Sequence, residues 1–117
     1  KKTGQRKNFF LKDIDLPHTL IYFESPLRIV DFLIDAFEVF GDRQAAICFE
    51  LTKKFERVHR GFLSDLIDEL ETATRKGEIS VVIASNNKKF TRSNETEISR
   101  LDERDAHHQR VRRRTDN

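Results

Sequence analysis

An abrupt change from strand-forming to helix-starting residues, within Thr19–Arg28, limits the fold of this chain more than any other feature of its sequence. The β-favouring run Thr19–Phe23 stops at a short segment with a polar residue and a proline, as a buried strand ended by a breaker does. Ser25 is a suitable helix cap, and Pro26 fits the first helical position because its missing N–H would have no intrahelical partner there. The stretch therefore predicts a strand that leads directly into a helix, with Glu24 at the junction.

The same alternation of strands and helices continues along the chain. Apolar residues recur at helical spacing in Pro26–Phe40 and in Leu63–Arg75, and Gly41 and Gly77 are suitable stops after these helices. The remaining apolar or alternating runs predict three more strands: Gln44–Leu51, Phe55–Gly61 and Ile79–Ala84. The order β-α-β-β-α-β predicts a two-layer α/β domain with a mixed sheet and its helices packed on the sheet. A ferredoxin-like arrangement matches this order, and other mixed sheets do too.

The length of 117 residues suits a single domain. The distribution of charged residues divides this sequence into three parts. Lys1–Lys12 has five basic residues and no acidic one, and it is expected to be a flexible basic loop anchored by aromatic side chains. Asp13–Ser85 has eight basic and fourteen acidic residues, and Asn86–Asn117 has nine basic and six acidic ones. Two basic arms around an acidic body suggest a polyanionic partner, although solvated charged tails explain the same pattern. We expect residues 1–18 to be a basic loop and lead-in, 19–84 the α/β domain, and 85–117 a polar basic tail.

Several functional classes lack their motifs in this sequence. No glycine-rich dinucleotide loop, P-loop or nucleophile elbow is present. The histidines lack metal-ligand spacing with one another or with Cys48, so no metal site is expected. Cys48 lies in an apolar run and is expected to be a buried, inert thiol that suits a reducing cytoplasm. No membrane span or signal peptide is visible, and a chain that starts at Lys1 without any Met suggests a fragment of a longer protein.

Polar side chains remain as candidates where the first two strands end: Glu24, Ser25, Glu50, Thr52 and Lys53. In open α/β sheets, ligands bind at the carboxyl ends of strands, so two carboxylates there are suited to bracket a polar ligand. Each candidate also has a structural explanation. Ser25 is a possible helix cap, Glu24 can accept from backbone N–H groups of the following helix, and Glu50 can pair with Lys53 or Arg28. The central expectation is that Glu24 and Glu50 lie side by side at one rim of the sheet.

Thr19–Arg28 resembles a segment of the tetrapyrrole (corrin/porphyrin) methylase superfamily, and more narrowly its ribosomal RNA small-subunit methyltransferase I branch. That branch has a strand and helix start of the type T-[LIM]-I-[FY]-[FY]-E-S-P-x-R. Further segments of the branch follow in order at Phe40-Gly41, Phe49–Lys53, Glu56–Gly61 and Lys76–Glu78, and a basic loop precedes them at Lys2–Arg6. The resemblance covers about Lys1–Ala84, and its motifs are specific together rather than singly.

The resemblance implies S-adenosylmethionine-dependent 2′-O-methylation of a cytidine ribose in small-subunit rRNA. It also implies that the chain is a C-terminal methylase domain that lacks its N-terminal partner domain, is inactive alone, and comes from a cytoplasmic homodimer. Phe49 stands where the family usually has Arg. Phe62 stands where a Thr often caps the second helix, which leaves Asp65 as the nearest substitute. Nothing carries over to Ser85–Asn117.

The resemblance also implies roles for individual residues. The cofactor-binding wall would comprise Tyr22, Phe23, Glu24, Ser25, Glu50, Leu51 and Thr52. The rRNA-contacting residues would be Lys2, Arg6, Lys7, Arg28 and Lys53. The catalytic base is not identified. The competing hypotheses are a non-catalytic RNA-binding module, a dimerisation module, and a methylase that acts on a corrin or porphyrin precursor.

Overall fold

The computed structural model describes residues 3–51 and 53–92. Along the chain the elements are α1 (Thr3–Leu11), β1 (Leu20–Glu24), α2 (Ile29–Phe40), β2 (Gln44–Phe49), β3 (Arg57–Phe62), α3 (Leu63–Thr72), β4 (Ile79–Ile83) and the 3₁₀ helix η1 (Lys88–Phe90). From β1 to β4 the expected order β-α-β-β-α-β is confirmed. The tail from residue 93 onward, Lys2 and Thr52 lie outside the described residues.

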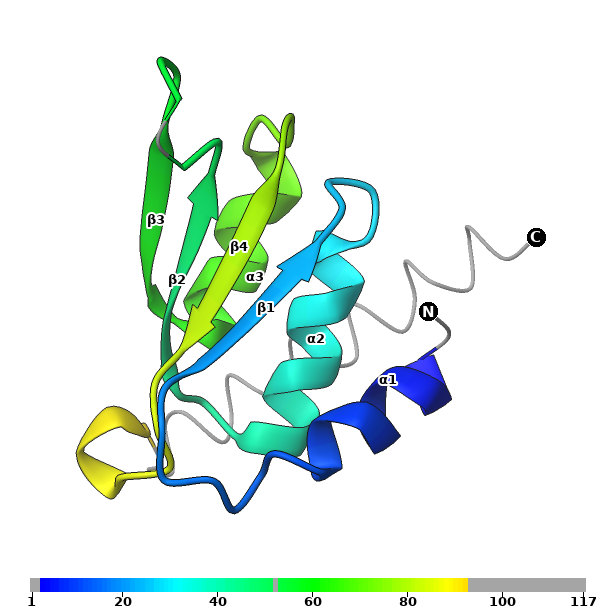
Figure 1. The fold of residues 1–117 in the computed structure, drawn as a ribbon, viewed down its shortest axis with the longest axis vertical. Coiled ribbons are helices and arrows are strands. Elements are labelled where there is room, and N and C mark those ends of the chain that lie inside the picture. The colour runs from blue at the N-terminus through cyan, green and yellow to red at the C-terminus, as the bar shows by residue number, and fades with distance from the viewer. Residues whose placement is uncertain (1–2, 52, 93–117) are drawn as a thin grey trace.

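The four strands form one sheet in the order β1-β4-β2-β3, and every neighbouring pair is antiparallel (Figure 1). The expectation of a mixed sheet was therefore wrong, because β4 lies between the two strands that run in the same direction, β1 and β2. With β1 at an edge, the sheet also differs from the ferredoxin-like arrangement, whose first strand is an inner one. In the observed register Ile79 pairs with Glu24 on one side and Phe49 on the other. The chain therefore leaves β1 and β2 at the same rim of the sheet.

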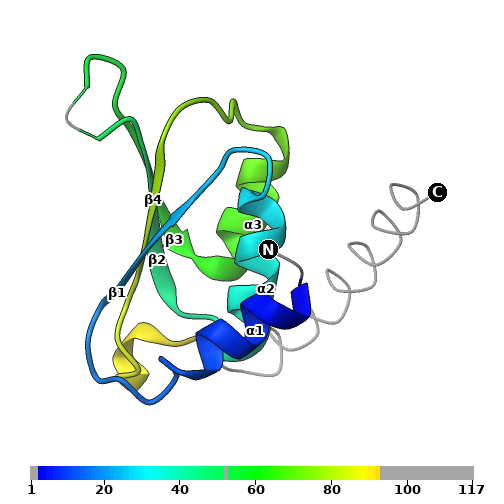
Figure 2. The same cartoon turned by 45° about the vertical axis from the view of Figure 1, so that its right-hand side comes forward.

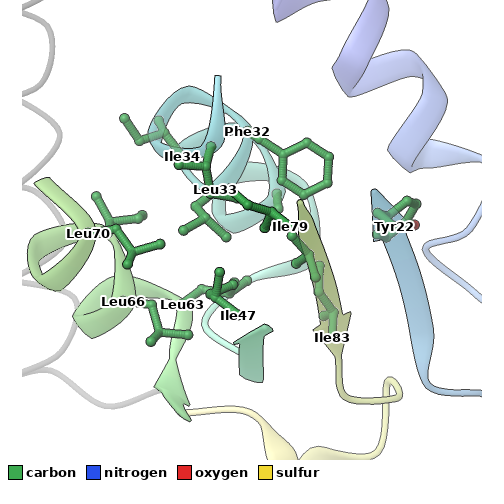
Figure 3. Close-up of a cluster of buried hydrophobic side chains, with 14 of the residues drawn as sticks. Tyr22, Phe32, Leu33, Ile34, Ile47, Leu63, Leu66, Leu70, Ile79 and Ile83 are labelled. Carbon is green, nitrogen blue, oxygen red and sulfur yellow. The ribbon is translucent and has the colours of Figure 1, made fainter. Parts of the chain in front are cut away.

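The three α-helices cover one face of the sheet, which gives the expected two layers (Figure 2). Side chains of β1, β2 and β4 enter the space between the layers, including Tyr22, Ile47, Ile79 and Ile83, and they meet the apolar faces of α2 and α3 (Figure 3). Burial of these faces supplies most of the stabilisation of a domain of this size. The opposite face of β1 is open, with Phe23 80% exposed.

The N-terminal segment is a helix, α1, and not the flexible loop that its charges suggested. Phe10 is fully buried in a ring cluster with Tyr22, Phe32 and Phe40, so the expected aromatic anchor is present. Arg6 lies one helical turn before Phe10, and its guanidinium donates to Asp35 of α2 over 2.5 Å. The sequence did not indicate this helix because its basic residues suggested a solvent-exposed loop. One of them, Arg6, is instead paired with Asp35 inside the fold.

The start of helix α2 differs from expectation. Helix α2 begins at Ile29 and not at Pro26, because Ser25 to Arg28 form a turn in which the Arg28 N–H donates to the Ser25 carbonyl. Ser25 is therefore not the cap of this helix. Gly41 ends α2 at a φ of 82°, as predicted.

Helix α3 begins at Leu63 as expected, but its cap comes from elsewhere in the chain. The Asp42 carboxylate, which precedes β2, accepts from the Ser64 N–H at 2.8 Å and from the Ser64 hydroxyl at 2.7 Å. Asp65, the expected substitute for the missing Thr, contacts Arg92 instead. Asp42 was missed because it is twenty-two residues from Ser64 in sequence.

The helices of the described part are short. The most apolar one, α2, has 12 residues. No helix within the described ranges combines the length and the apolar character that a bilayer crossing requires.

Candidate functional site

A groove of about 740 Å³ opens at the rim where β1 and β2 end. We call it the rim groove, and its lining includes Glu24, Ser25, Arg28, Glu50, Lys53 and Glu78. The structure thus brings together the two strand-end carboxylates that the sequence singled out. Both line this groove because β1 and β2 flank β4 and run in the same direction, so the two strands end at the same edge of the sheet.

Glu24 lines this groove with its side chain only 10% exposed. Its Oε1 atom accepts from the Ser25 N–H at 2.8 Å and from Arg28 Nε at 3.0 Å. The Arg28 side chain is itself 53% exposed. Glu24 is therefore oriented by its neighbours, and it holds a partly exposed guanidinium at the edge of the groove.

Ser25 contributes a buried hydroxyl to the same wall. Its Oγ atom is inaccessible to solvent, and no hydrogen-bond partner for it is present in the described part of the structure. A buried polar atom without a partner carries a free-energy penalty, typically about 1–3 kcal/mol. In a residue that lines a groove, such an atom is a candidate for a hydrogen bond to a ligand.

Glu50 occupies the corresponding position after β2 in an uncommon backbone conformation, with a φ of 55°. Its Oε1 atom accepts from the Glu78 N–H at 2.8 Å, and its own N–H donates to the Glu78 carbonyl at 2.9 Å. The carboxylate lies over Gly77, where a Cβ atom would be 1.7 Å from Oε1. Glu50 therefore fastens the end of β2 to the turn that precedes β4.

Lys53 completes the charged lining of the groove. Its Nζ atom lies 3.6 Å from Glu50 Oε2 and 3.4 Å from Glu78 Oε1. The charge of Glu50, followed by the interactions with Glu78, raises the pKa of Lys53 above its ordinary value. Since lysine is already protonated at neutral pH, this shift keeps the ammonium charged over a wider alkaline range.

The lining holds three carboxylates and two cations, which suits a polar ligand with a positive part and an oxyanion. A metal site is a separate question. Among residues 3–51 and 53–92, no group of three or more His, Cys, Asp or Glu side chains is arranged to hold an ion.

The other sequence candidates for the cofactor wall are divided between the groove and the core. Phe23 lines the rim groove, and Leu51 directly follows Glu50 as an exposed residue. Tyr22 lies in the core, where its hydroxyl donates to Asp13 Oδ2 at 2.7 Å. Burial and this carboxylate raise the pKa of Tyr22. Its ring is therefore a packing element beneath α1.

The expected phosphate-binding residues of the N-terminal segment are also paired within the fold. Arg6 is 3% exposed and bonded to Asp35, so its assignment as an rRNA contact is corrected to a structural role. Lys7 is partly exposed and forms an ion pair with Glu38. Burial of Arg6 was not readable from the sequence because its partner is twenty-nine residues away.

The sequence assigned Gly77 only a role as a helix stop and gave Glu78 no role, whereas the structure ends α3 at Thr72 and places both residues in the rim groove. A signal existed in the short Lys76–Glu78 motif before the last strand. The motif alone gives these residues no physical role, because that role depends on their contacts with Glu50.

Comparison with known proteins gives a consistent set of relatives, while no protein-family model matches the sequence. A protein of Streptococcus pyogenes named "Ribosomal RNA small subunit methyltransferase I" is 40% identical over 84 residues, which are 72% of this chain and 29% of that protein. Proteins of the same name from Halalkalibacterium halodurans and Rickettsia prowazekii are 41% identical over 71 residues and 31% identical over 86 residues. These matches cover 61% and 74% of this chain, and 25% and 31% of those proteins.

The chain thus spans about three-tenths of the length of the S. pyogenes relative. Identities of 31–41% over most of the chain, in several bacteria, establish common ancestry. Over most of its length, the chain is therefore homologous to part of the proteins named ribosomal RNA small subunit methyltransferase I.

Proposed function

We propose that this chain is the C-terminal domain of an S-adenosylmethionine-dependent methyltransferase that 2′-O-methylates a cytidine ribose in small-subunit rRNA. The names of the relatives support a methyltransferase that acts on this RNA. The S. pyogenes relative is about three times as long as the matched region, which supports a further domain, and in this proposal that domain faces the rim groove. On this proposal the 117-residue chain is inactive alone, and the complete enzyme works in the cytoplasm.

The observation that carries the proposal is the meeting of Glu24 and Glu50 in one open groove at the ends of two strands. The lining fits S-adenosylmethionine in its chemistry, because the buried Ser25 hydroxyl needs a polar partner and the carboxylates suit a positively charged ligand. In the proposal Phe23, Glu24 and Ser25 bind one side of the cofactor.

S-Adenosylmethionine, when bound, supplies an electrophilic methyl group. The chain's own contribution is to bind and orient, since the ribose hydroxyl must be aligned with that methyl group and lose its proton. Arg28 and Lys53 are partly exposed cations at the groove and are the proposed contacts to rRNA phosphates, with Lys7 as a further one. The catalytic base belongs to another part of the enzyme in this proposal.

The test uses the full-length enzyme with the substitution Glu24→Gln. Methyl transfer from labelled S-adenosylmethionine to small ribosomal subunits should fall at least about tenfold, the effect of losing about 1.4 kcal/mol of transition-state stabilisation. The thermal unfolding midpoint should change little. Glu56→Gln removes an exposed carboxylate outside the groove and is the matched control. Unchanged methylation in Glu24→Gln, or methyl transfer by the 117-residue chain alone, would contradict the proposal.

A homodimer is the second part of the proposal, and the edge strand β1 supports it. Ile21 is 62% exposed on the same open face as Phe23, and a strand edge with apolar neighbours favours pairing with another chain. Sedimentation of the full-length protein should give a dimer, and Ile21→Ser with Phe23→Ser should shift it toward monomer. A monomeric unsubstituted protein would rule this part out.

A further inference from the structure

The end of β2 and the turn before β4 are joined by four residues, Glu50, Lys53, Gly77 and Glu78, which we call the rim clasp. The Glu50 N–H donates one backbone hydrogen bond to the Glu78 carbonyl. The Glu50 carboxylate accepts a second hydrogen bond from the Glu78 N–H. The Lys53 N–H donates to the Glu50 carbonyl at 3.0 Å, which closes the loop over the same residue.

The backbone indicates that this geometry is imposed by its surroundings. Within residues 3–51 and 53–92, Glu50 is the only residue other than glycine with a positive φ. Such a conformation disfavours an L-residue by roughly 1–2 kcal/mol and persists where surrounding contacts overdetermine it. Gly77 has a φ of 90° and leaves the space that the Glu50 carboxylate occupies.

Both oxygens of Glu50 are engaged within the clasp. Oε1 is bonded to the Glu78 N–H, and Oε2 is the oxygen nearest to Lys53 Nζ. Lys53 has the opposite character, since its side chain is 51% exposed and lines the groove. An ammonium group has three donors, and the two carboxylates at 3.4 and 3.6 Å leave room for a further acceptor.

We propose that Glu50 is a positioning residue, which holds the Lys53 ammonium at the mouth of the rim groove to bind an oxyanion of the ligand. The proposal rests on the proposed function, in which the groove takes a methyl donor and rRNA, and it replaces the assignment of Glu50 as a direct cofactor contact. The oxyanion is the carboxylate of the donor or a phosphate of the RNA. Gly77 is required because any side chain there would displace the Glu50 carboxylate.

The binding test uses the full-length protein, with S-adenosylmethionine affinity measured by calorimetry and rRNA affinity measured by filter binding over a range of salt concentrations. Lys53→Gln should lower the affinity for one of the two ligands about tenfold. A loss confined to S-adenosylmethionine identifies the donor carboxylate as the bound group. A loss of affinity confined to rRNA identifies a phosphate as the bound group. The slope of log affinity against log salt concentration should then be smaller by about 1. Lys54→Gln removes a neighbouring exposed lysine that does not line the groove, and it should leave both affinities unchanged.

A double-mutant cycle separates positioning from direct contact. Glu50→Gln alone and Gly77→Ala alone should each lower the affinity for the same ligand that Lys53→Gln affects. Combining Glu50→Gln with Lys53→Gln should cause no further loss, because Glu50 acts through Lys53. Additive losses would show that Glu50 contacts the ligand directly, and unchanged affinities in Lys53→Gln would show that Lys53 binds no oxyanion. Either result would overturn the proposal.

A measurement without ligand distinguishes failure of this proposal from failure of the proposed function. Titration of Lys53 by NMR, with selectively labelled lysine, should show a lower pKa in Glu50→Gln and Gly77→Ala than in the unsubstituted protein. An unchanged Lys53 titration would refute the positioning role whatever the protein binds. A protein that binds neither S-adenosylmethionine nor rRNA would refute the proposed function and the oxyanion role with it.

Discussion

Arg6 of α1 and Asp35 of α2 form a buried ion pair, with 2.5 Å between Nη1 and Oδ2 and side chains that are 3% and 0% exposed. The pair joins the first helix to the layer that covers the sheet. Arg6→Met removes the guanidinium that pairs with the buried Asp35 carboxylate, so the free energy of unfolding should fall by about 3–5 kcal/mol. Urea denaturation of the chain, followed by circular dichroism, measures this change.

The matched control for this pair is Lys7→Met, one residue further along α1. Lys7 and Glu38 are also an ion pair, but both side chains are about one-third exposed. Solvent screening limits such a pair to under about 1 kcal/mol. Equal losses in the Arg6 and Lys7 variants would show that burial of Arg6 is not what makes its pair important.

Gly77 should tolerate substitution less well than Gly41, although both have a positive φ. In Gly41→Ala the new Cβ would lie 4.0 Å from Thr91 Cγ2, an ordinary van der Waals contact, so only the backbone penalty of about 1–2 kcal/mol applies. Gly77→Ala must in addition displace the Glu50 carboxylate, which should add about 1 kcal/mol. The difference in urea midpoint between the two variants tests this, and equal midpoints would argue against the rim clasp.

Asp42→Ala should destabilise the domain by at least about 2 kcal/mol, because it removes the cap of α3 and leaves the Ser64 N–H without this acceptor. Asp42→Asn retains one oxygen acceptor and should lose less. Asp65→Ala removes a partly exposed partner of Arg92 and should change stability by under about 1 kcal/mol. Thermal unfolding of the three variants gives the order, and a larger loss in the Asp65 variant would reverse the cap assignment.

Tyr22 should make the domain sensitive to alkaline pH. Burial, and next the hydrogen bond to Asp13, raise the pKa of Tyr22 in the folded state, while the unfolded chain keeps the ordinary value of about 10. The neutral hydroxyl therefore contributes stability that is fully present below pH of about 10 and is lost as pH rises further. Tyr22→Phe should reduce this alkaline loss. As the chain has one tyrosine, tyrosinate absorbance reports the titration directly, and ionisation near pH 10 in the folded chain would contradict the prediction.

The sequence by itself determined the succession of strands and helices from β1 to β4, the stop at Gly41, and the two carboxylates at strand ends. These features depend on apolar periodicity and backbone preference over a few neighbouring residues, which act wherever the segment lies. The same local view placed the start of α2 three residues too early, because the preference of Ser25 and Pro26 for a helix start was overridden by a turn.

The tertiary structure alone decided the strand order, the burial of Arg6, the capping of α3 by Asp42, and the contact of Glu50 with Gly77. Each depends on residues that are far apart in sequence, such as the twenty-nine positions between Arg6 and Asp35. A charged side chain is either a surface contact or a structural element according to whether an opposite charge meets it in the core. That meeting follows from how the layers pack, and no local pattern specifies it.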